Sequence, residues 1–133
     1  MKKIRMKNIK HLPAFIVDDD PFWTEVLRQI LAKIGFTKIH TFEDGESCLK
    51  NIHLNPGMIF LDYQMEHSNG LDILKEVKGY YPGIEVVFCT AMENLEVAIA
   101  AMEYGSVEYL LKSNVTEELV VEIVSNSQTA KVA

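Results

Sequence analysis

Short apolar runs alternate along the chain with longer segments whose apolar residues recur at helical spacing. The runs of strand length cover residues 14–17, 38–42, 58–61, 84–89 and 107–111. The central runs are apolar throughout and do not alternate with polar residues, which is typical of strands covered on both faces. The pattern therefore predicts buried strands separated by helices.

Five segments of helical periodicity follow the five runs. Apolar residues mark them at Phe22, Val26, Leu27, Ile30, Leu31 and Ile34, at Cys48, Leu49 and Ile52, at Leu71, Leu74 and Val77, at Val97, Ala98, Ala101 and Met102, and at Leu119, Val120, Ile123 and Val124. In the first segment, apolar residues recur every four positions from Phe22 to Ile34. This spacing predicts a helix of about four turns with one broad apolar stripe. Gly35 ends this helix as a C-cap glycine does, and the Asn-Pro-Gly sequence at 55–57 closes the second.

Five strand–helix units in series predict an α/β fold with a doubly wound, five-stranded parallel sheet covered by helices on both faces. Right-handed crossovers are expected for such (βα)5 units, and the strand order 2-1-3-4-5 suits a chain of this length. We expect one domain over residues 13–127, preceded by a basic arm at 1–12 and followed by a polar tail at 128–133.

Charge is distributed unevenly along the chain. The 133 residues carry 13 basic and 19 acidic side chains, a formal net charge of −6. Residues 1–12 hold five of the bases and no acid, so the remainder has eight bases against 19 acids, a net charge of −11. An acidic domain would repel the phosphate backbone of a nucleic acid, so direct nucleic-acid binding is not expected. The basic segment is interpreted as a solvated arm, with contact to an acidic partner as the alternative.

The two cysteines, Cys48 and Cys89, are too few for a disulfide scaffold and lie among apolar neighbours. They are interpreted as core residues of a protein in the reducing cytoplasm. The longest apolar runs, such as residues 97–102, are far shorter than the ~20 residues that a membrane span needs. No apolar segment of the secretory type follows the basic start, so neither membrane contact nor secretion is expected.

The apolar runs end in charged or polar side chains. These are Asp18, Asp19 and Asp20 after the first run, Asp62 after the third, Thr90 after the fourth and Lys112 after the fifth. The carboxyl ends of parallel strands meet at one edge of the sheet, which is where ligands bind in such folds. The topology therefore predicts a single site that combines carboxylates, a hydroxyl and an ammonium group.

Clustered carboxylates repel one another unless a cation lies between them. Oxygen ligands of this kind suit Mg²⁺, whose coordination is usually completed by water and phosphate oxygens. The Lys112 ammonium and the Thr90 hydroxyl are suited to hold the oxygens of a transferring phosphoryl group. A carboxylate can itself be the nucleophile and form an aspartyl phosphate. Asp62, alone at the end of the middle strand, is the best candidate for this role.

Four motifs together resemble the receiver domain of two-component response regulators, over about residues 13–127. The resemblance rests on Val17-Asp18-Asp19-Asp20-Pro21, on Phe60-Leu61-Asp62 with Met65 and Gly70 at the family's spacing, on Cys89-Thr90-Ala91 and on Tyr109-Leu110-Leu111-Lys112. Each motif alone is weak, but the four occur in order and each closes its own strand. The resemblance implies a flavodoxin-like fold.

The resemblance also implies a role for each site residue. Asp62 is the expected phosphoacceptor, and Mg²⁺ (or Mn²⁺) is the expected cofactor, with Asp18 acting on it largely through water. The expected metal ligands are Asp18, Asp19, Asp62 and the backbone carbonyl of Gln64. Thr90 and Lys112 are expected to contact the phosphoryl group, and Thr90 is expected to form a conformational switch with Tyr109. A static core aromatic is the alternative interpretation of Tyr109.

The same resemblance implies partners and an output. A histidine kinase or a phosphotransfer protein would supply the phosphoryl group in a phosphorelay, and the domain would catalyse only its own phosphorylation and dephosphorylation. Phosphorylation would shift the surface formed by the fourth helix, the fifth strand and the fifth helix, where an output protein would bind. A homodimer of the phosphorylated form is a further expected assembly, and the domain would act in the cytoplasm.

Two positions depart from the family pattern. Glu66 follows the motif residue Met65 where receivers usually have proline, so a less rigid and more acidic loop is expected. Ser113 follows Lys112 where the family usually has a proline joined by a cis peptide bond. A cis bond before a non-proline residue costs ~2.5–4 kcal/mol. The Lys112–Ser113 bond is therefore expected to be trans, or cis under strain.

Two other functions fit parts of the pattern. A haloacid-dehalogenase-like phosphatase also uses an aspartate nucleophile, but its motif D-x-D-x-T/V is broken where Pro21 and Phe22 follow Asp20. A module that signals through contacts without phosphorylation is the other alternative, and it predicts no binding of Mg²⁺ or beryllofluoride.

Overall fold

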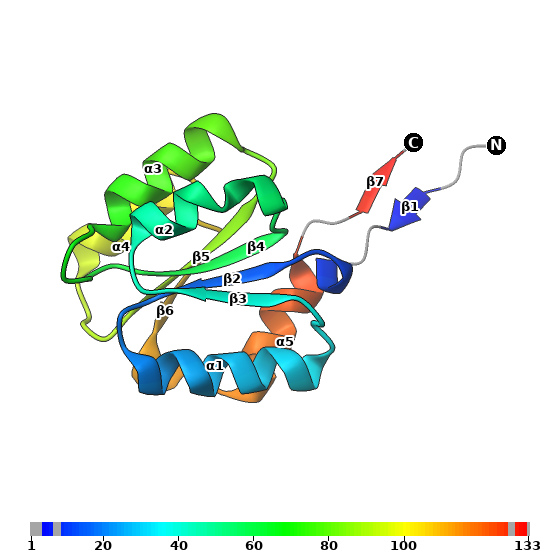
Figure 1. Ribbon diagram of the computed structural model, residues 1–133, viewed down its shortest axis with the longest axis horizontal. Coiled ribbons are helices and arrows are strands. Elements are labelled where there is room, and N and C mark those ends of the chain that lie inside the picture. Colours follow the sequence, from blue (N-terminus) through cyan, green and yellow to red (C-terminus); the bar gives the residue numbers. More distant parts are fainter. Residues whose placement is uncertain (1–3, 7–8, 128–129, 133) are drawn as a thin grey trace.

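The computed structural model describes residues 4–6, 9–127 and 130–132. Five parallel strands form its central sheet: β2 (Ala14–Val17), β3 (Ile39–Phe42), β4 (Met58–Asp62), β5 (Glu85–Thr90) and β6 (Glu108–Leu111). They lie in the order β3-β2-β4-β5-β6 (Figure 1), which is the predicted order 2-1-3-4-5 of the sheet strands. The predicted doubly wound α/β fold is therefore confirmed.

Helices cover both faces of the sheet (Figure 1). They are α1 (Pro21–Ile34), α2 (Gly45–Lys50), α3 (Gly70–Tyr80), α4 (Leu95–Glu103) and α5 (Glu117–Asn126), with the 3-10 helices η1 (Ile9–His11), η2 (Ile52–Leu54) and η3 (Lys112–Asn114). A hydrophobic cluster under α1 and α5 lies on one face, and a second cluster under α2, α3 and α4 lies on the other. Within the described ranges, no helix is long and apolar enough to cross a lipid bilayer.

Side chains of β2 alternate between these two clusters. Ala14 and Ile16 pack under α1 and α5, whereas Phe15 and Val17 pack under the helices of the other face. The alternation follows from the two-residue period of a strand, and burial on both faces explains why the run is apolar throughout. The first polar residue after the run, Asp18, therefore stands at the carboxyl end of a fully covered strand.

The buried stripe of α1 differs from the predicted one. Leu27 and Leu31 are buried, and Trp23 packs partly against the same cluster. Phe22, which was predicted to lie on the apolar stripe, is 78% exposed. Phe22 precedes Leu27 by five residues, which places it about 140° away around a helix that turns 100° per residue. The prediction for Phe22 is therefore wrong.

The second predicted helix is divided in two. α2 ends at Lys50 and η2 begins at Ile52. Between them, the side-chain amide of Asn51 donates to the Ser47 carbonyl oxygen at 2.8 Å, and its backbone N–H donates to the Cys48 carbonyl oxygen at 3.0 Å. Asparagine competes in this way with regular helical bonds, so the prediction of one helix through Ile52 is wrong.

A second, two-stranded sheet joins segments from the two ends of the chain. β1 (Ile4–Met6) pairs antiparallel with β7 (Ala130–Val132) (Figure 1). Between β1 and β2, Ile9 is only 7% exposed and belongs to the cluster under α1 and α5. The expectation of a solvated arm over residues 1–12 is wrong at Ile9, because burying isoleucine removes apolar surface from water. The rest of the predicted arm and tail, at 1–3, 7–8, 128–129 and 133, lies outside the described residues.

Candidate functional site

Four neighbouring strands deliver charged or polar side chains to the carboxyl edge of the sheet. Asp18 and Asp19 follow β2, Asp62 ends β4, Thr90 ends β5 and Lys112 follows β6. These strands are adjacent in the sheet, so the structure brings the predicted side chains to one place. Asp18, Asp62 and Thr90 are 4%, 5% and 2% exposed, so the base of the site is buried.

Lys112 lies at the centre of this group. Its Nζ is 2.6 Å from Asp18 Oδ2 and 3.4 Å from Asp62 Oδ1. The same atom lies 5.7 Å from the centre of the Trp23 ring, within the range of a cation–π interaction. One ammonium group therefore contacts two buried carboxylates and an aromatic ring of α1.

Three carboxylates form an acidic cluster at the site. One oxygen from each of Asp18, Asp19 and Asp62 lies within 4.8 Å of the others. Asp18 and Asp62 are buried, and Asp19 is exposed. Three carboxylates facing one lysine leave an excess of negative charge. An oxygen-only donor set with this charge fits a hard divalent cation such as Mg²⁺.

Burial and mutual repulsion change how the site ionises. Burial, together with the charge of Asp18, raises the pKa of Asp62 to about 6, although Lys112 opposes the shift. Burial also raises the pKa of Asp18, against the lowering effect of its contact with Lys112. For Lys112, burial favours loss of the proton, but the two carboxylates outweigh burial and raise the pKa. The carboxylates are thus costly to ionise, while the lysine keeps its charge.

The three aspartates that follow β2 have two different roles. Asp20 is the N-cap of α1, and its Oδ1 accepts hydrogen bonds from the backbone N–H groups of Phe22 and Trp23 at 3.0 and 3.2 Å. The N–H of Asp20 donates to Asp18 Oδ1 at 2.9 Å. Asp20 therefore serves the helix, and Asp18 and Asp19 remain for the site.

Gly70 holds the loop between β4 and α3 close to the end of the strand. A Cβ at this position would overlap the carbonyl oxygen of Asp62, so a glycine is required. The Gly70 N–H donates to the Tyr63 carbonyl oxygen at 2.8 Å, and Gln64 and Asn69 pair across the loop. The Gln64 carbonyl oxygen accepts no hydrogen bond from any residue that the structure describes, which leaves it available as a ligand.

Thr90 and Tyr109 are connected through the loop after β5. Thr90 Oγ1 accepts a hydrogen bond from the backbone N–H of Met92 at 3.3 Å. The Tyr109 hydroxyl donates to the Met92 carbonyl oxygen at 3.3 Å, and its ring stacks on Phe88 with the centroids 6.1 Å apart. Met92 therefore contacts both residues of the predicted switch.

The segment after Lys112 is a single 3-10 turn. No peptide bond between described residues is cis, so the Lys112–Ser113 bond is trans, one of the two expected forms. The Lys112 carbonyl oxygen accepts a hydrogen bond from the Val115 N–H at 3.3 Å. Lys112 thus reaches the two carboxylates without the proline that the family usually has.

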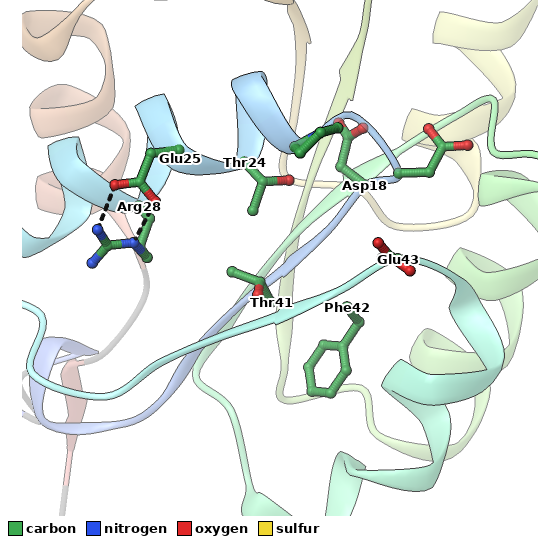
Figure 2. A pocket seen from close by; sticks show the side chains of 9 residues that line it. Asp18, Thr24, Glu25, Arg28, Thr41, Phe42 and Glu43 are labelled. Atoms are coloured by element: carbon green, nitrogen blue, oxygen red, sulfur yellow. Dashed lines mark hydrogen bonds and ion pairs between the residues drawn. The ribbon is translucent and has the colours of Figure 1, made fainter.

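A pocket of about 280 Å³ opens beside the carboxylates, between α1 and β3. Figure 2 shows in it Asp18 and Glu43 on one side, Thr24 and Thr41 in the middle, and Arg28 paired with Glu25 on the other side. Glu43 follows the edge strand β3 and adds negative charge near the acidic cluster. Sequence reasoning missed Glu43, because nothing in its neighbourhood distinguishes it from a loop residue.

A backbone contact at the site was missed as well. The N–H of Glu66 donates to Asp19 Oδ2 at 2.9 Å, across a separation of 47 residues. The only indication in the sequence was the missing proline after Met65, since a backbone donor at this position requires another residue.

Comparison with known proteins agrees with this geometry. A sequence model of the response regulator receiver domain matches residues 14–124. The DNA-binding transcriptional regulator NtrC of Escherichia coli K12 is 34% identical over 100 residues, which cover 74% of this chain and 21% of NtrC. The probable C4-dicarboxylate response regulator DctR of Halalkalibacterium halodurans is 31% identical over 108 residues, which cover 80% of this chain and 47% of DctR. The chain thus spans about half the length of DctR and about a fifth of NtrC.

Smaller relatives and solved structures match over most of their length. The chemotaxis protein CheY of Thermotoga maritima is 30% identical over 100 residues, covering 74% of this chain and 83% of CheY. The receiver domain of NtrX from Brucella abortus superposes with a TM-score of 0.78 at 26% identity, covering 86% of this chain and 96% of that one. The BeF3-activated DrrB receiver domain has a TM-score of 0.78 at 23% identity, with 86% and 95% covered, and supports the fold alone. With its motifs, its fold and its relatives in agreement, this chain belongs to the response regulator receiver domain family of two-component signalling.

Proposed function

We propose that Asp62 accepts a phosphoryl group from a histidine kinase or a histidine phosphotransfer protein in a cytoplasmic phosphorelay. The proposal rests on the position of Lys112, whose Nζ lies 2.6 Å from the buried Asp18 and 3.4 Å from the buried Asp62. An ammonium in this position is suited to neutralise a phosphoryl group on Asp62.

The residues of this chain supply the groups that the transfer needs. Burial and the charge of Asp18 raise the pKa of Asp62 to about 6, so the carboxylate is mostly ionised at neutral pH and attacks without a separate base. The phosphorus–oxygen bond to Asp62 forms as the phosphorus–nitrogen bond to histidine breaks, and the nitrogen keeps the electron pair. Lys112 and Thr90 would offer an ammonium and a hydroxyl to the phosphoryl oxygens.

Mg²⁺ or Mn²⁺ would be held by Asp19, Asp62 and the backbone carbonyl of Gln64, with Asp18 acting largely through water. Support comes from the donor chemistry, because three carboxylates within 4.8 Å face only one lysine. When bound, the ion would neutralise the carboxylates and orient the phosphoryl oxygens.

The output of the reaction would pass through the contacts of Met92. A Thr90 hydroxyl that turns toward a phosphoryl oxygen gives up the Met92 N–H, and the Met92 carbonyl in turn holds Tyr109. Met92 precedes α4 and Tyr109 lies in β6. The change would therefore alter the surface of α4, β6 and α5, where an output protein or a second phosphorylated copy would bind.

The test is phosphorylation with acetyl phosphate and Mg²⁺, followed by intact-mass analysis. Wild type should gain one phosphate and Asp62→Asn should gain none. Asp20→Asn is the matched control, because asparagine also caps a helix, and it should gain one phosphate. Labelling of Asp62→Asn at the wild-type rate would overturn the assignment. Failure of wild type to bind Mg²⁺ and beryllofluoride would favour a module that signals without phosphorylation.

A further inference from the structure

The carboxylate of Asp19 is the least restrained member of the acidic cluster. Asp18 and Asp62 are buried and contact Lys112, whereas Asp19 is exposed. Among the described residues, the single hydrogen bond to its side chain comes from the backbone N–H of Glu66, at 2.9 Å. An exposed side chain without a partner samples several rotamers, so this hydrogen bond decides where the Asp19 carboxylate lies.

Glu66 can make the bond because it has the N–H that a proline lacks. The loop that carries it is tied down on both sides of the donor. The Met65 N–H donates to the Ser68 carbonyl oxygen at 3.3 Å, and Ser68 Oγ accepts a hydrogen bond from the Gly45 N–H at 2.9 Å. The loop is thereby fastened to the start of α2, and the N–H of Glu66 is presented toward the end of β2.

We infer that the backbone N–H of Glu66 is a positioning group that orients Asp19 for the cation, an inference that rests on the proposed Mg²⁺ site. A hydrogen bond to one carboxylate oxygen fixes the side chain and leaves the other oxygen for the ion. The N–H dipole also offsets part of the repulsion from Asp18 and Asp62, whose oxygens lie within 4.8 Å. Loss of an outer hydrogen bond to a metal ligand typically weakens binding by roughly 10–100-fold.

The test compares Mg²⁺ affinity in Glu66→Pro and Glu66→Ala by titration calorimetry. Both variants remove a side chain that is 79% exposed, but only proline removes the N–H. Glu66→Ala should stay within about threefold of wild type, because exposed charges are screened, and Glu66→Pro should bind about tenfold more weakly. Thermal unfolding of the two variants in EDTA checks that both are folded at the temperature of the titration. Equal affinity in the two variants, or tighter binding by Glu66→Pro, would overturn the inference.

Amide hydrogen exchange keeps the inference testable if proline distorts the loop. In metal-free protein, Asp19→Ala should accelerate exchange at the Glu66 amide about tenfold, as expected for the loss of a hydrogen bond to a charged group. Asp72→Ala, which removes an exposed carboxylate of α3, should leave it unchanged. Unchanged exchange in Asp19→Ala would overturn the inference. A wild type that binds no Mg²⁺ would refute the proposed function instead, so the two failures are distinguishable.

Discussion

At the scale of single residues, the site keeps charged side chains away from solvent, which is unfavourable for the free energy of folding. Asp18 and Asp62 are almost inaccessible to solvent, and Lys112 contacts both. Removing Lys112 would leave two buried carboxylates without a countercharge, which costs more than the ion pairs contribute. The carboxylates therefore depend on the lysine when no other cation is bound.

We predict that Asp62→Asn stabilises the metal-free domain at neutral pH. Burial and the charge of Asp18 raise the pKa of Asp62 to about 6 from an ordinary 3.8, so the folded state binds this proton more tightly than the unfolded state. The resulting stability is fully present below about pH 4 and is lost as the pH rises through about 6. The neutral amide avoids that loss, on the order of 1–3 kcal/mol. Thermal unfolding in EDTA at pH 7.5 should show a midpoint several degrees above wild type.

The exposed carboxylate of Asp72 provides the control. Asp72→Asn should change the free energy of unfolding by less than about 0.5 kcal/mol, because it loses only an interaction with the dipole of α3. At pH 4.5, the advantage of Asp62→Asn should shrink, since the wild-type carboxyl is then largely protonated. A wild type that is more stable than Asp62→Asn at pH 7.5 would contradict the sign of the shift.

At the scale of elements, the loops after the strands are shaped by backbone contacts. Gly70 begins α3 directly against the carbonyl of Asp62, and Asp20 caps α1 next to Asp18. These short connections hold the helices against the site, so a small displacement of one loop would also move side chains of the acidic cluster.

We predict that Gly70→Ala lowers the free energy of unfolding by about 1–3 kcal/mol, because its methyl group would overlap the Asp62 carbonyl oxygen and push the loop outward. Gly79→Ala, in the same helix, is the matched control, since a methyl group there meets no atom within 4 Å. It should raise the stability by about 0.5–1 kcal/mol, the helix preference of alanine over glycine. Urea unfolding of the two variants measures both effects. A similar change in both would show that the contact at Gly70 is unimportant.

The sequence predicts the elements where hydrophobic periodicity is strong. It misses the features whose conformation is determined by local hydrogen bonds. The run from Ala14 to Val17 has the same bounds in the structure, because burial on both faces leaves a clear apolar pattern. Spacing alone placed Phe22 on the buried stripe, although the orientation of α1 depends on its packing against α5 and the sheet. The break at Asn51 and the donor at Glu66 depend on single hydrogen bonds, which no periodicity reveals.

At the scale of the whole molecule, the segment before the sheet contributes to the core. Ile9 packs in the cluster under α1 and α5, and a Cβ at Gly57 would lie 2.6 Å from its Cδ1. η1 therefore closes the sheet on the side where β2 begins (Figure 1), whereas the acidic cluster lies where β2 and β4 end.

We predict that Ile9→Ala lowers the free energy of unfolding by about 2–3 kcal/mol, the usual cost of truncating a buried isoleucine. His11→Ala, two residues later and exposed, should have an effect of less than about 0.5 kcal/mol. Urea unfolding in the absence and in the presence of Mg²⁺ distinguishes an effect of the substitution on the free energy of unfolding from an effect on metal binding. A loss below about 0.5 kcal/mol for Ile9→Ala would mean that this segment is dispensable for the fold.

The pairing of β1 with β7 has a practical consequence for handling the protein. Both strands lie on the side of the molecule where β2 begins (Figure 1), whereas Asp18 and Asp62 lie at the carboxyl ends of β2 and β4. An affinity handle or a fluorescent protein fused beyond either strand would leave the carboxyl edge of the sheet accessible. Two dyes attached there would report on separation of the strand pair.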